Sequence, residues 1–391
     1  MTPDTWKVRG GHRLQGTLPP SGSKNAALPE LAACLLADSE CRLSNVPEIR
    51  DVVAMRGILE SMGCRVTADA GVVTVDPGGA SPGKQDQGLC RTIRASILLA
   101  GPMAARFGTV ELPPPGGDVI GRRRLDTHFL ALEQLGARVE YRRELIRITA
   151  PDGLRGARIH LDEPSVTATE NAMMAASVAS GYTEIYNAAC EPNVQDLAAM
   201  LSAMGADIKG AGTNLLCING RGGPLRGAEH RVCPDHIEIG SFIGLAACCR
   251  GEVLIPGVPG SILQPIMTGL GKLGVEIRYR NGDLTIPADQ PLEVRPDMSG
   301  DIPTIYDGPW PGFSPDLTST AVVTATQARG TSLIFEKMFE SRLFFTDKLA
   351  AMGARLILCD PHRVVVTGPC RLHGTEVSSP DIRAGMALLT A

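Results

Sequence analysis

The phrase Leu59-Glu-Ser-Met-Gly63-Cys-Arg-Val66 decides the fold, because the chain repeats it. Each copy has a leucine four residues before a glycine and an apolar residue three residues after it, and successive glycines are 69 to 79 residues apart. Glycine adopts a positive φ at little cost, so each copy predicts the end of a helix followed directly by a strand. The other copies begin at Leu132, Leu201, Leu270 and Leu349.

A second phrase, rich in small and apolar residues, opens each repeat. Small residues allow close packing of helices, so we expect these helices to lie inside the protein, covered by sheets. Short alternating stretches between the phrases, such as Arg65–Thr67 and Val364–Val366, predict the strands of those sheets. The opening phrases begin near Asn25, Arg94, Thr169, Gly240, Thr318 and Arg383.

Six opening phrases and five closing phrases indicate an α/β protein of two domains, each built from three repeats, with the sixth repeat incomplete. We predict a first domain at residues 22–232, with a loop at 113–124, and a second domain at residues 1–21 plus 233–391. Residues 1–21 are expected to pair with the second domain. The sixth closing glycine would fall beyond Ala391. The sequence is therefore interpreted as C-terminally incomplete, either a fragment or a protein that has lost its last unit.

Composition excludes several classes of protein. The 391 residues carry a net charge of −4, no basic tract and 4% aromatic residues, so no nucleic-acid partner is expected. No apolar run approaches the roughly 18 residues of a membrane span, and the first residues carry no secretory signal, so no membrane partner is expected. The eleven cysteines form no CxxC pair and no zinc-type spacing, which is typical of reduced, buried thiols in a cytoplasmic protein. The oligomeric state stays open.

Short motifs along the chain carry a resemblance to a known family. They are SGSKNAALP from Ser21, TIRAS from Thr92, PGGDVIG from Pro115, PSV from Pro164, EP from Glu191 with Asp196, PDHIE from Pro234, PD from Pro315, FESR from Phe339 and DIRA from Asp381. Each is weak alone, but their order and spacing resemble the UDP-N-acetylglucosamine 1-carboxyvinyltransferase family of enolpyruvyl transferases, over essentially the whole chain. The loop 113–121 resembles this UDP-sugar branch and not the sister branch, 3-phosphoshikimate 1-carboxyvinyltransferase.

The resemblance implies a fold and a reaction. The family fold is a pair of inside-out α/β barrels of three repeats each, in agreement with the six opening phrases. The family reaction moves the enolpyruvyl group of phosphoenolpyruvate to the 3′-hydroxyl of UDP-N-acetylglucosamine and releases phosphate, as the first committed step of peptidoglycan synthesis. Such a reaction needs an acid, a base, and cations for a phosphate and a carboxylate. It implies no redox cofactor and no metal.

The resemblance also assigns roles to residues at the motif positions. It implies that Asp118 is the acid, that Asp316 is the base near the 3′-hydroxyl, and that Lys24 and Arg383 are catalytic cations at phosphoenolpyruvate. Lys24 and Arg383 open the first and the last predicted helix in equivalent positions. Substrate contacts are implied for Lys24, Asn25, Arg94, Arg123, Asp126, Ser165, Val166, Asp316, Met338, Arg342 and Asp381.

Asp118 departs from the family pattern, in which a cysteine commonly stands at this position as the proton donor. A carboxylic acid donates the same proton if its surroundings raise its pKa. Three prolines and two glycines in the loop from Pro113 to Asp118 are typical of a segment that closes over a ligand. The antibiotic fosfomycin inactivates the family by alkylating the cysteine thiolate, and a carboxylate is a poorer nucleophile. We therefore expect this protein to resist fosfomycin.

Each position also has a structural interpretation that the sequence leaves open. Lys24 is then a surface lysine, Arg94 an ion pair at a helix start, and Arg122–Arg124 a solvated basic turn. Asp316 is a favoured helix N-cap residue, a role that is compatible with catalysis. Met338 by itself is typical of a core residue.

Further departures keep other functions open. Glu163 stands where some members have lysine and Thr167 where glycine is usual, and both changes bear on the nucleotide contacts. His236 replaces a common arginine and is interpreted as structural. The leading prediction is the enzyme of the resembled family. The alternatives are an enolpyruvyl transferase that acts on another nucleotide, and an inactive homologue that binds a UDP-sugar.

Overall fold

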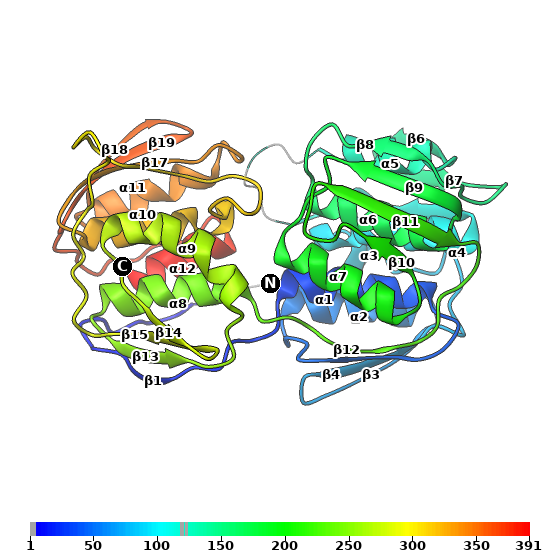
Figure 1. The fold of residues 1–391 in the computed structure, drawn as a ribbon, viewed down its shortest axis with the longest axis horizontal. Helices are drawn as coiled ribbons and strands as arrows, with labels where there is room; N and C mark the ends of the chain where they lie inside the picture. Colours follow the sequence, from blue (N-terminus) through cyan, green and yellow to red (C-terminus); the bar gives the residue numbers. More distant parts are fainter. Residues whose placement is uncertain (1–4, 118–120, 122–123) are drawn as a thin grey trace. The chain divides into compact units, whose positions relative to one another are not determined.

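The computed structural model describes residues 5–117, 121 and 124–391, which divide into two compact units. In each unit, helices lie between β-sheets (Figure 1). We call them the N-terminal unit, Ser21–Gly117 with Arg124–Asp235, and the C-terminal unit, which holds the described residues before Ser21 together with His236–Ala391.

The N-terminal unit is centred on the helices that open its repeats. Almost every residue of α1 and α6 is buried, because their sequences are rich in alanine, leucine and methionine on all faces. Further helical segments pack around this centre. The central segments are α1 (Lys24–Ala33), η2 (Arg94–Leu99), α4 (Ala100–Phe107) and α6 (Val166–Val178), and the remaining segments are η1 (Cys34–Leu36), α2 (Arg50–Ser61), α3 (Gln87–Cys90), α5 (Asp126–Gln134) and α7 (Pro192–Ala203).

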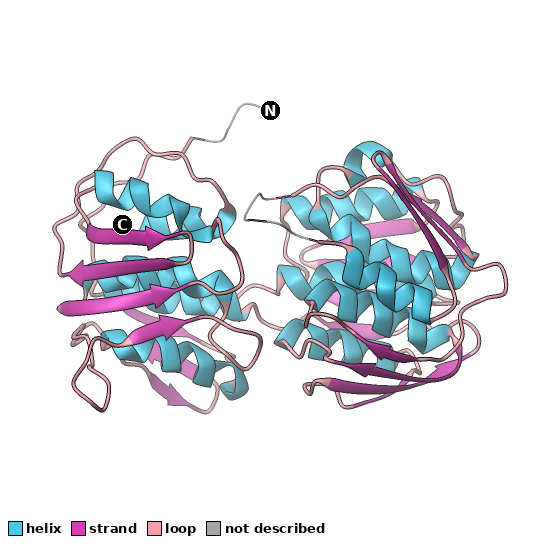
Figure 2. Cartoon of the chain, turned by 90° about the horizontal axis from the view of Figure 1, so that it is seen from above, coloured by secondary structure: helices cyan, strands magenta, loops and turns pink. Residues whose placement is uncertain are grey.

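Sheets cover these helices at the periphery of the unit (Figure 2). One has the order β12-β2-β4-β3, from Glu229–Arg231, Cys41–Ser44, Val72–Asp76 and Arg65–Asp69. The next has the order β5-β7-β6, from Thr109–Leu112, Leu145–Thr149 and Arg138–Arg142. The third has the order β10-β11-β9-β8, from Asp207–Lys209, Leu215–Arg221, Ser180–Tyr186 and Arg158–His160.

The C-terminal unit repeats this plan. Its central helices are α8 (His236–Cys248), α10 (Thr318–Gln327) and α12 (Ile382–Thr390), and its other helical segments are η3 (Gly260–Ile262), α9 (Leu263–Leu270), η4 (Gly271–Leu273), η5 (Pro315–Leu317), η6 (Arg342–Phe345) and α11 (Thr346–Ala351). One sheet has the order β1-β13-β15-β14, from Gln15–Thr17, Glu252–Ile255, Asp283–Ile286 and Arg278–Arg280. The other has the order β16-β17-β19-β18, from Thr304–Tyr306, Gly330–Phe335, Arg363–Gly368 and Arg355–Asp360.

The closing glycines behave as their spacing predicts. Gly63, Gly136, Gly205 and Gly353 have φ values between 100° and 102°, and Gly274 has 76°. Each follows a helical segment and precedes a strand: β3, β6, β10 and β18 begin two residues after their glycines, and β14 begins four residues after Gly274. The helix–glycine–strand prediction is confirmed in all five repeats that carry the phrase.

The segment before the first helix pairs as expected. β1 runs parallel to β13, with Gln15 opposite Glu252 and Thr17 opposite Leu254. The domain boundaries expected from the repeats, 22–232 against 1–21 plus 233–391, stay a prediction, because contacts in the folded chain do not test whether either part folds alone.

The expectation of buried thiols is wrong for Cys359. All eleven cysteines are free, and most are buried or half-buried, but Cys359 is exposed. It lies on β18, an edge strand that is exposed along most of its length, where the pairing with β19 is irregular between Leu358 and Asp360. Among the residues that the structure describes, no helix is long and apolar enough to cross a membrane.

Candidate functional site

In the C-terminal unit, three of the residues assigned by resemblance lie in direct contact. The Asp316 carboxylate accepts from Arg342 Nη2 at 2.7 Å through Oδ1, and from Arg383 Nη2 at 2.8 Å and Nε at 3.0 Å through Oδ2. The side chains of Asp316 and Arg383 are 23% and 16% exposed, whereas that of Arg342 is 3% exposed. The side chains of Asp316 and Arg383 are thus partly exposed and in contact with the buried Arg342 guanidinium, and these are the charge types that a phosphorylated acid and a hydroxyl require.

Helix starts hold this cluster in place. Asp316 lies in η5, where the Ser314 hydroxyl accepts from the Asp316 backbone N–H at 3.3 Å. Asp381 is the N-cap of α12 and accepts from the backbone N–H groups of Arg383 and Ala384 at 2.8 and 3.0 Å. Its side chain is thus engaged in capping, which orients the helix that carries Arg383.

A buried acid lies behind Arg342. Glu336 is fully buried, and its Oε2 lies 3.9 Å from Arg342 Nε. Burial and then the neighbouring Asp307 carboxyl raise the pKa of Glu336 to about 9, although the Arg342 charge acts in the opposite direction. Glu336 therefore carries a proton at neutral pH. Within the described residues, Glu336 Oε2 and Asp307 Oδ2 have no hydrogen-bond partner of normal geometry, which suits a proton held between the two carboxyls.

The same glutamate orders the loop that carries Met338. Its Oε1 accepts from the backbone N–H groups of Met338 and Phe339 at 3.2 and 3.0 Å. Met338 is 38% exposed and available to a ligand rather than buried in the core. Sequence reasoning missed Glu336, although a signal exists. Ser332 and Ile334 alternate inward along β17, and Glu336 continues that period with a charged residue at a buried position.

In the N-terminal unit, Lys24 is the first residue of α1, and its Nζ lies 3.0 Å from Asp51 Oδ2 on α2. The Lys24 side chain is 23% exposed. Asn25 follows it in the first turn, where backbone N–H groups and the helix dipole favour an anion. The ion pair fits the structural interpretation of Lys24, but a partly exposed lysine at a helix start is also open to an incoming phosphate.

Arg94 and Asp126 belong to one chain of contacts. Arg94 Nη2 donates to the Arg124 backbone oxygen at 3.2 Å, and Arg124 Nε donates to Asp126 Oδ2 at 2.8 Å. Gly116, in the loop that begins at Pro113, packs directly against the backbone near Arg94. A Cβ at Gly116 would lie 2.0 Å from the Arg91 backbone oxygen. That position therefore requires glycine. The predicted acid Asp118 and the predicted sugar contact Arg123 lie outside the described residues.

Ser165 and Val166 open α6, where Ser165 is the N-cap and its hydroxyl accepts from the Ala168 backbone N–H at 3.4 Å. The next residue, Thr167, turns its hydroxyl to His128 Nε2 at 3.0 Å. Burial, and then the Arg94 charge, lower the pKa of His128 to about 3, so this histidine is neutral. Its Nδ1 lies 2.9 Å from Asn171 Nδ2.

Glu163 and His236 are the other two described residues that depart from the family pattern. Glu163 is exposed, and its Oε1 lies 3.5 Å from the Thr127 hydroxyl. His236 is buried and packs edge-on against Trp310, with ring centroids 5.8 Å apart. The structural interpretation of His236 agrees with this packing.

Comparisons with known proteins fit this fold and these residues. Residues 8–391 match the family model of EPSP synthase (3-phosphoshikimate 1-carboxyvinyltransferase). Among solved structures, the enolpyruvyl transferase NikO from Streptomyces tendae is similar with a TM-score of 0.86 and 25% identity, over 98% of this chain and 89% of that one. EPSP synthase from Acinetobacter baumannii shares the fold, with a TM-score of 0.72 and 19% identity over 97% of this chain and 90% of that one. The class is thus that of the carboxyvinyl transferases.

Curated relatives narrow the class. UDP-N-acetylglucosamine 1-carboxyvinyltransferase from Bradyrhizobium diazoefficiens is 52% identical over 100% of this chain, and the enzyme of that name from Treponema denticola is 53% identical over 98%. The match covers 90% of the length of each relative. The chain belongs to the UDP-N-acetylglucosamine 1-carboxyvinyltransferase family of enolpyruvyl transferases.

Proposed function

We propose that the protein transfers the enolpyruvyl group of phosphoenolpyruvate to the 3′-hydroxyl of UDP-N-acetylglucosamine and releases phosphate. The observation that carries the proposal is the Asp316 carboxylate, held at 2.7 Å from Arg342 and 2.8 Å from Arg383. Relatives named for this activity, at 52 and 53% identity, support the choice of substrates. We place the reaction in the cytoplasm, as a step of peptidoglycan synthesis that serves cell-wall growth, cell shape and division.

The proposed reaction has two steps. In the addition, the sugar O3′ bonds to C2 of phosphoenolpyruvate while Asp316 takes the hydroxyl proton and Asp118 delivers a proton to C3. In the elimination, C3 returns a proton to the Asp118 carboxylate and the bond between C2 and the phosphate oxygen breaks, which restores the carbon–carbon double bond as an enol ether. The departing phosphate takes the proton that Asp316 holds, so both aspartates regain their starting states. One phosphate leaves for each enolpyruvyl group transferred. Lys24 and Arg383 offset the charge of phosphoenolpyruvate.

The remaining assignments are proposals of the same kind. Asp381 acts by orienting Arg383 through the helix cap. Glu336 is a positioning residue for Arg342 and for the Met338 loop. The substrate contacts proposed from the resemblance are Asn25, Arg94, Arg123, Asp126, Ser165, Val166, Met338 and Arg342.

Phosphate release from phosphoenolpyruvate, measured with and without UDP-N-acetylglucosamine, tests the proposal. We expect release only with the sugar nucleotide, and a loss of about 10²- to 10⁴-fold in Asp316→Asn, as for removal of a general base. Asp347→Asn is the matched control, because Asp347 is an exposed aspartate of the same unit, paired with Lys348. An equal loss in both variants would point to instability and not to catalysis.

The wild-type result separates the competing functions. Binding of UDP-N-acetylglucosamine without phosphate release would indicate an inactive sugar-nucleotide-binding homologue. Absence of binding would direct the search to another acceptor nucleotide.

A further inference from the structure

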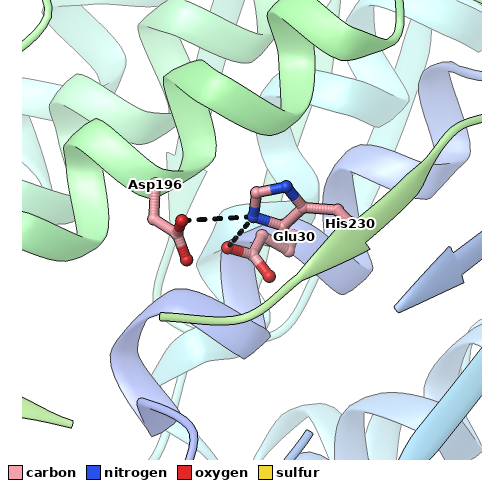
Figure 3. Close-up of side chains that lie close together, drawn as sticks. All are labelled: Glu30, Asp196 and His230. Atoms are coloured by element: carbon pink, nitrogen blue, oxygen red, sulfur yellow. Dashed lines mark hydrogen bonds and ion pairs between the residues drawn. The ribbon is translucent and has the colours of Figure 1, made fainter. Parts of the chain in front are cut away.

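Three ionisable side chains from distant parts of the sequence converge in the N-terminal unit, and none of them is used by the proposed reaction. Figure 3 shows Glu30 on α1, Asp196 on α7 and His230 on β12 directed toward one another. His230 Nε2 lies 3.2 Å from Asp196 Oδ1 and 3.5 Å from Glu30 Oε1. One nitrogen or oxygen atom of each residue lies within 4.8 Å of the other two.

Glu30 is the unusual member of this cluster. Its side chain is fully buried, and among the described residues neither of its carboxylate oxygens has a hydrogen-bond partner. His230 Nε2 carries at most one hydrogen, and Asp196 Oδ1 is the closer acceptor for it. Burying a carboxylate whose oxygens accept no hydrogen bond costs free energy. A positively charged ligand next to these oxygens would offset that cost.

Carboxyl groups outnumber basic groups in the surroundings of Glu30. Asp196 opposes the ionisation of Glu30, and Glu30 in turn opposes that of Glu170, a second fully buried acid of α6 whose oxygen accepts from Asn193 at 2.8 Å. His230 is the cationic group that acts on Glu30. A metal ion binds only the neutral imidazole, so a divalent cation at the cluster would displace the proton of His230 and take over its charge toward Glu30 and Asp196.

We propose that Glu30, Asp196 and His230 bind a divalent transition-metal ion of the zinc class. Oxygen and nitrogen ligands about 2.0–2.2 Å from a tetrahedral zinc ion lie roughly 3.3–3.6 Å from one another. The distances of 3.2 and 3.5 Å at His230 Nε2 are close to that spacing. An imidazole beside two carboxylates suits zinc or cobalt, whereas magnesium and calcium favour ligand sets made of oxygen alone.

The ion would join segments that the sequence keeps far apart. Asp196 Oδ2 accepts from the Cys233 backbone N–H at 2.7 Å, and the Cys233 oxygen accepts from the Ser23 backbone N–H at 2.8 Å. The site is thereby linked to the residue that precedes α1. Asp196 and His230 are each 13% exposed, which leaves an entry path. The role is architectural, and no step of the proposed reaction passes through the ion.

A shared proton is the competing occupant, because burial raises the pKa of Glu30 to about 8. The test therefore uses metals directly. The full chain is treated with a chelator and titrated with Co²⁺ and then Zn²⁺. We expect the visible absorption of tetrahedral Co²⁺ to saturate at one equivalent and to disappear when Zn²⁺ is added. Zn²⁺ at about a hundred times its Kd should raise the Tm of the unit by about 5 to 10 °C.

Matched variants assign the site. Glu30→Gln and His230→Gln should lose both the absorption and the Tm shift. His160→Gln, which changes an exposed histidine of the same unit, and Cys359→Ser, which removes the exposed thiol, should retain both. Binding that is unchanged in Glu30→Gln or His230→Gln, or lost in either control, would overturn the proposal.

X-ray absorption of the zinc-loaded wild type gives a second measurement that needs no variant. A first shell of oxygen and nitrogen at about 2.0–2.1 Å supports the site, and a shell dominated by sulfur at about 2.3 Å overturns it in favour of adventitious binding to cysteines. Absence of any metal bound at one equivalent overturns it in favour of the shared proton.

Discussion

The protonated glutamate behind Arg342 makes stability depend on pH in a direction that can be calculated. Glu336 titrates near its usual value of 4.5 in the unfolded chain and near 9 in the folded protein. Its contribution to stability is therefore fully present below pH 4.5 and is lost progressively as the pH rises toward 9. One pH unit within this window corresponds to about 1.4 kcal/mol, so between pH 5 and pH 8 the group lowers the free energy of unfolding by up to about 4 kcal/mol.

Glu336→Gln removes this titration and keeps the neutral shape. An amide oxygen still accepts from the Met338 and Phe339 backbone N–H groups, which are 3.2 and 3.0 Å from Glu336 Oε1. Because part of the raised pKa of Glu336 comes from the neighbouring Asp307 carboxyl, we expect the free energy of unfolding to change by about 2 to 4 kcal/mol. Relative to wild type, the variant should gain that much stability between pH 5 and pH 8.

Urea unfolding at pH 5, 6, 7 and 8 measures the effect. Trp310 reports on the C-terminal unit, because the only other tryptophan, Trp6, is 81% exposed in the folded protein. Glu293→Gln is the control, since Glu293 is an exposed glutamate of the same unit and its substitution should leave the pH profile unchanged. Parallel profiles for wild type and Glu336→Gln would refute the assignment of the proton to Glu336.

Further predictions test the other parts of the site. Thr167→Val should cost about 1 to 3 kcal/mol in thermal unfolding of the N-terminal unit, because it removes the partner of the buried His128; an unchanged Tm would contradict this. Asp381→Ala should cost about 0.5 to 2 kcal/mol through loss of the α12 cap while Asp381→Asn retains most of it, and equal losses would indicate that the charge and not the cap matters. Wild type should keep its activity in fosfomycin and Asp118→Cys should lose it, with one covalent adduct by mass spectrometry; an adduct on Asp118 of the wild type would contradict the prediction.

Local signals in the sequence were sufficient for the fold. A backbone position that must adopt a positive φ is indicated in the sequence by glycine. Gly63 and Gly353 lie nearly three hundred residues apart, and their φ values are 100° and 101°. The opening helices are predicted from their small residues, which allow close packing inside the protein, and α1 and α6 are buried along most of their length. The exposure of Cys359 does not follow from its residue type, since the exposure of an edge strand depends on what lies beside it.

The candidate functional site depends on contacts between residues far apart in the sequence, and no regular spacing in the sequence predicts such contacts. The resemblance groups Asp316, Arg342 and Arg383, and only the packing of η5, η6 and α12 brings each guanidinium within 3 Å of the Asp316 carboxylate. Glu30 and His230 lie two hundred residues apart on an internal helix and an edge strand. A fully buried glutamate in an otherwise apolar helix was a detectable signal, but its partners could not be deduced.

The position of Glu336 connects stability to the proposed chemistry. Arg342 lies between two acids, with Nη2 at 2.7 Å from Asp316 and Nε at 3.9 Å from Glu336. While Glu336 is protonated, the charge of Arg342 is directed mainly to Asp316; once Glu336 ionises, the two carboxylates compete for one guanidinium. If Arg342 holds Asp316 toward the sugar hydroxyl, kcat/KM of the wild type should fall as the pH passes about 9, and Glu336→Gln should keep its activity further into the alkaline range. A wild type and a variant with the same alkaline limb would show that Glu336 serves the loop at Met338 and not the base.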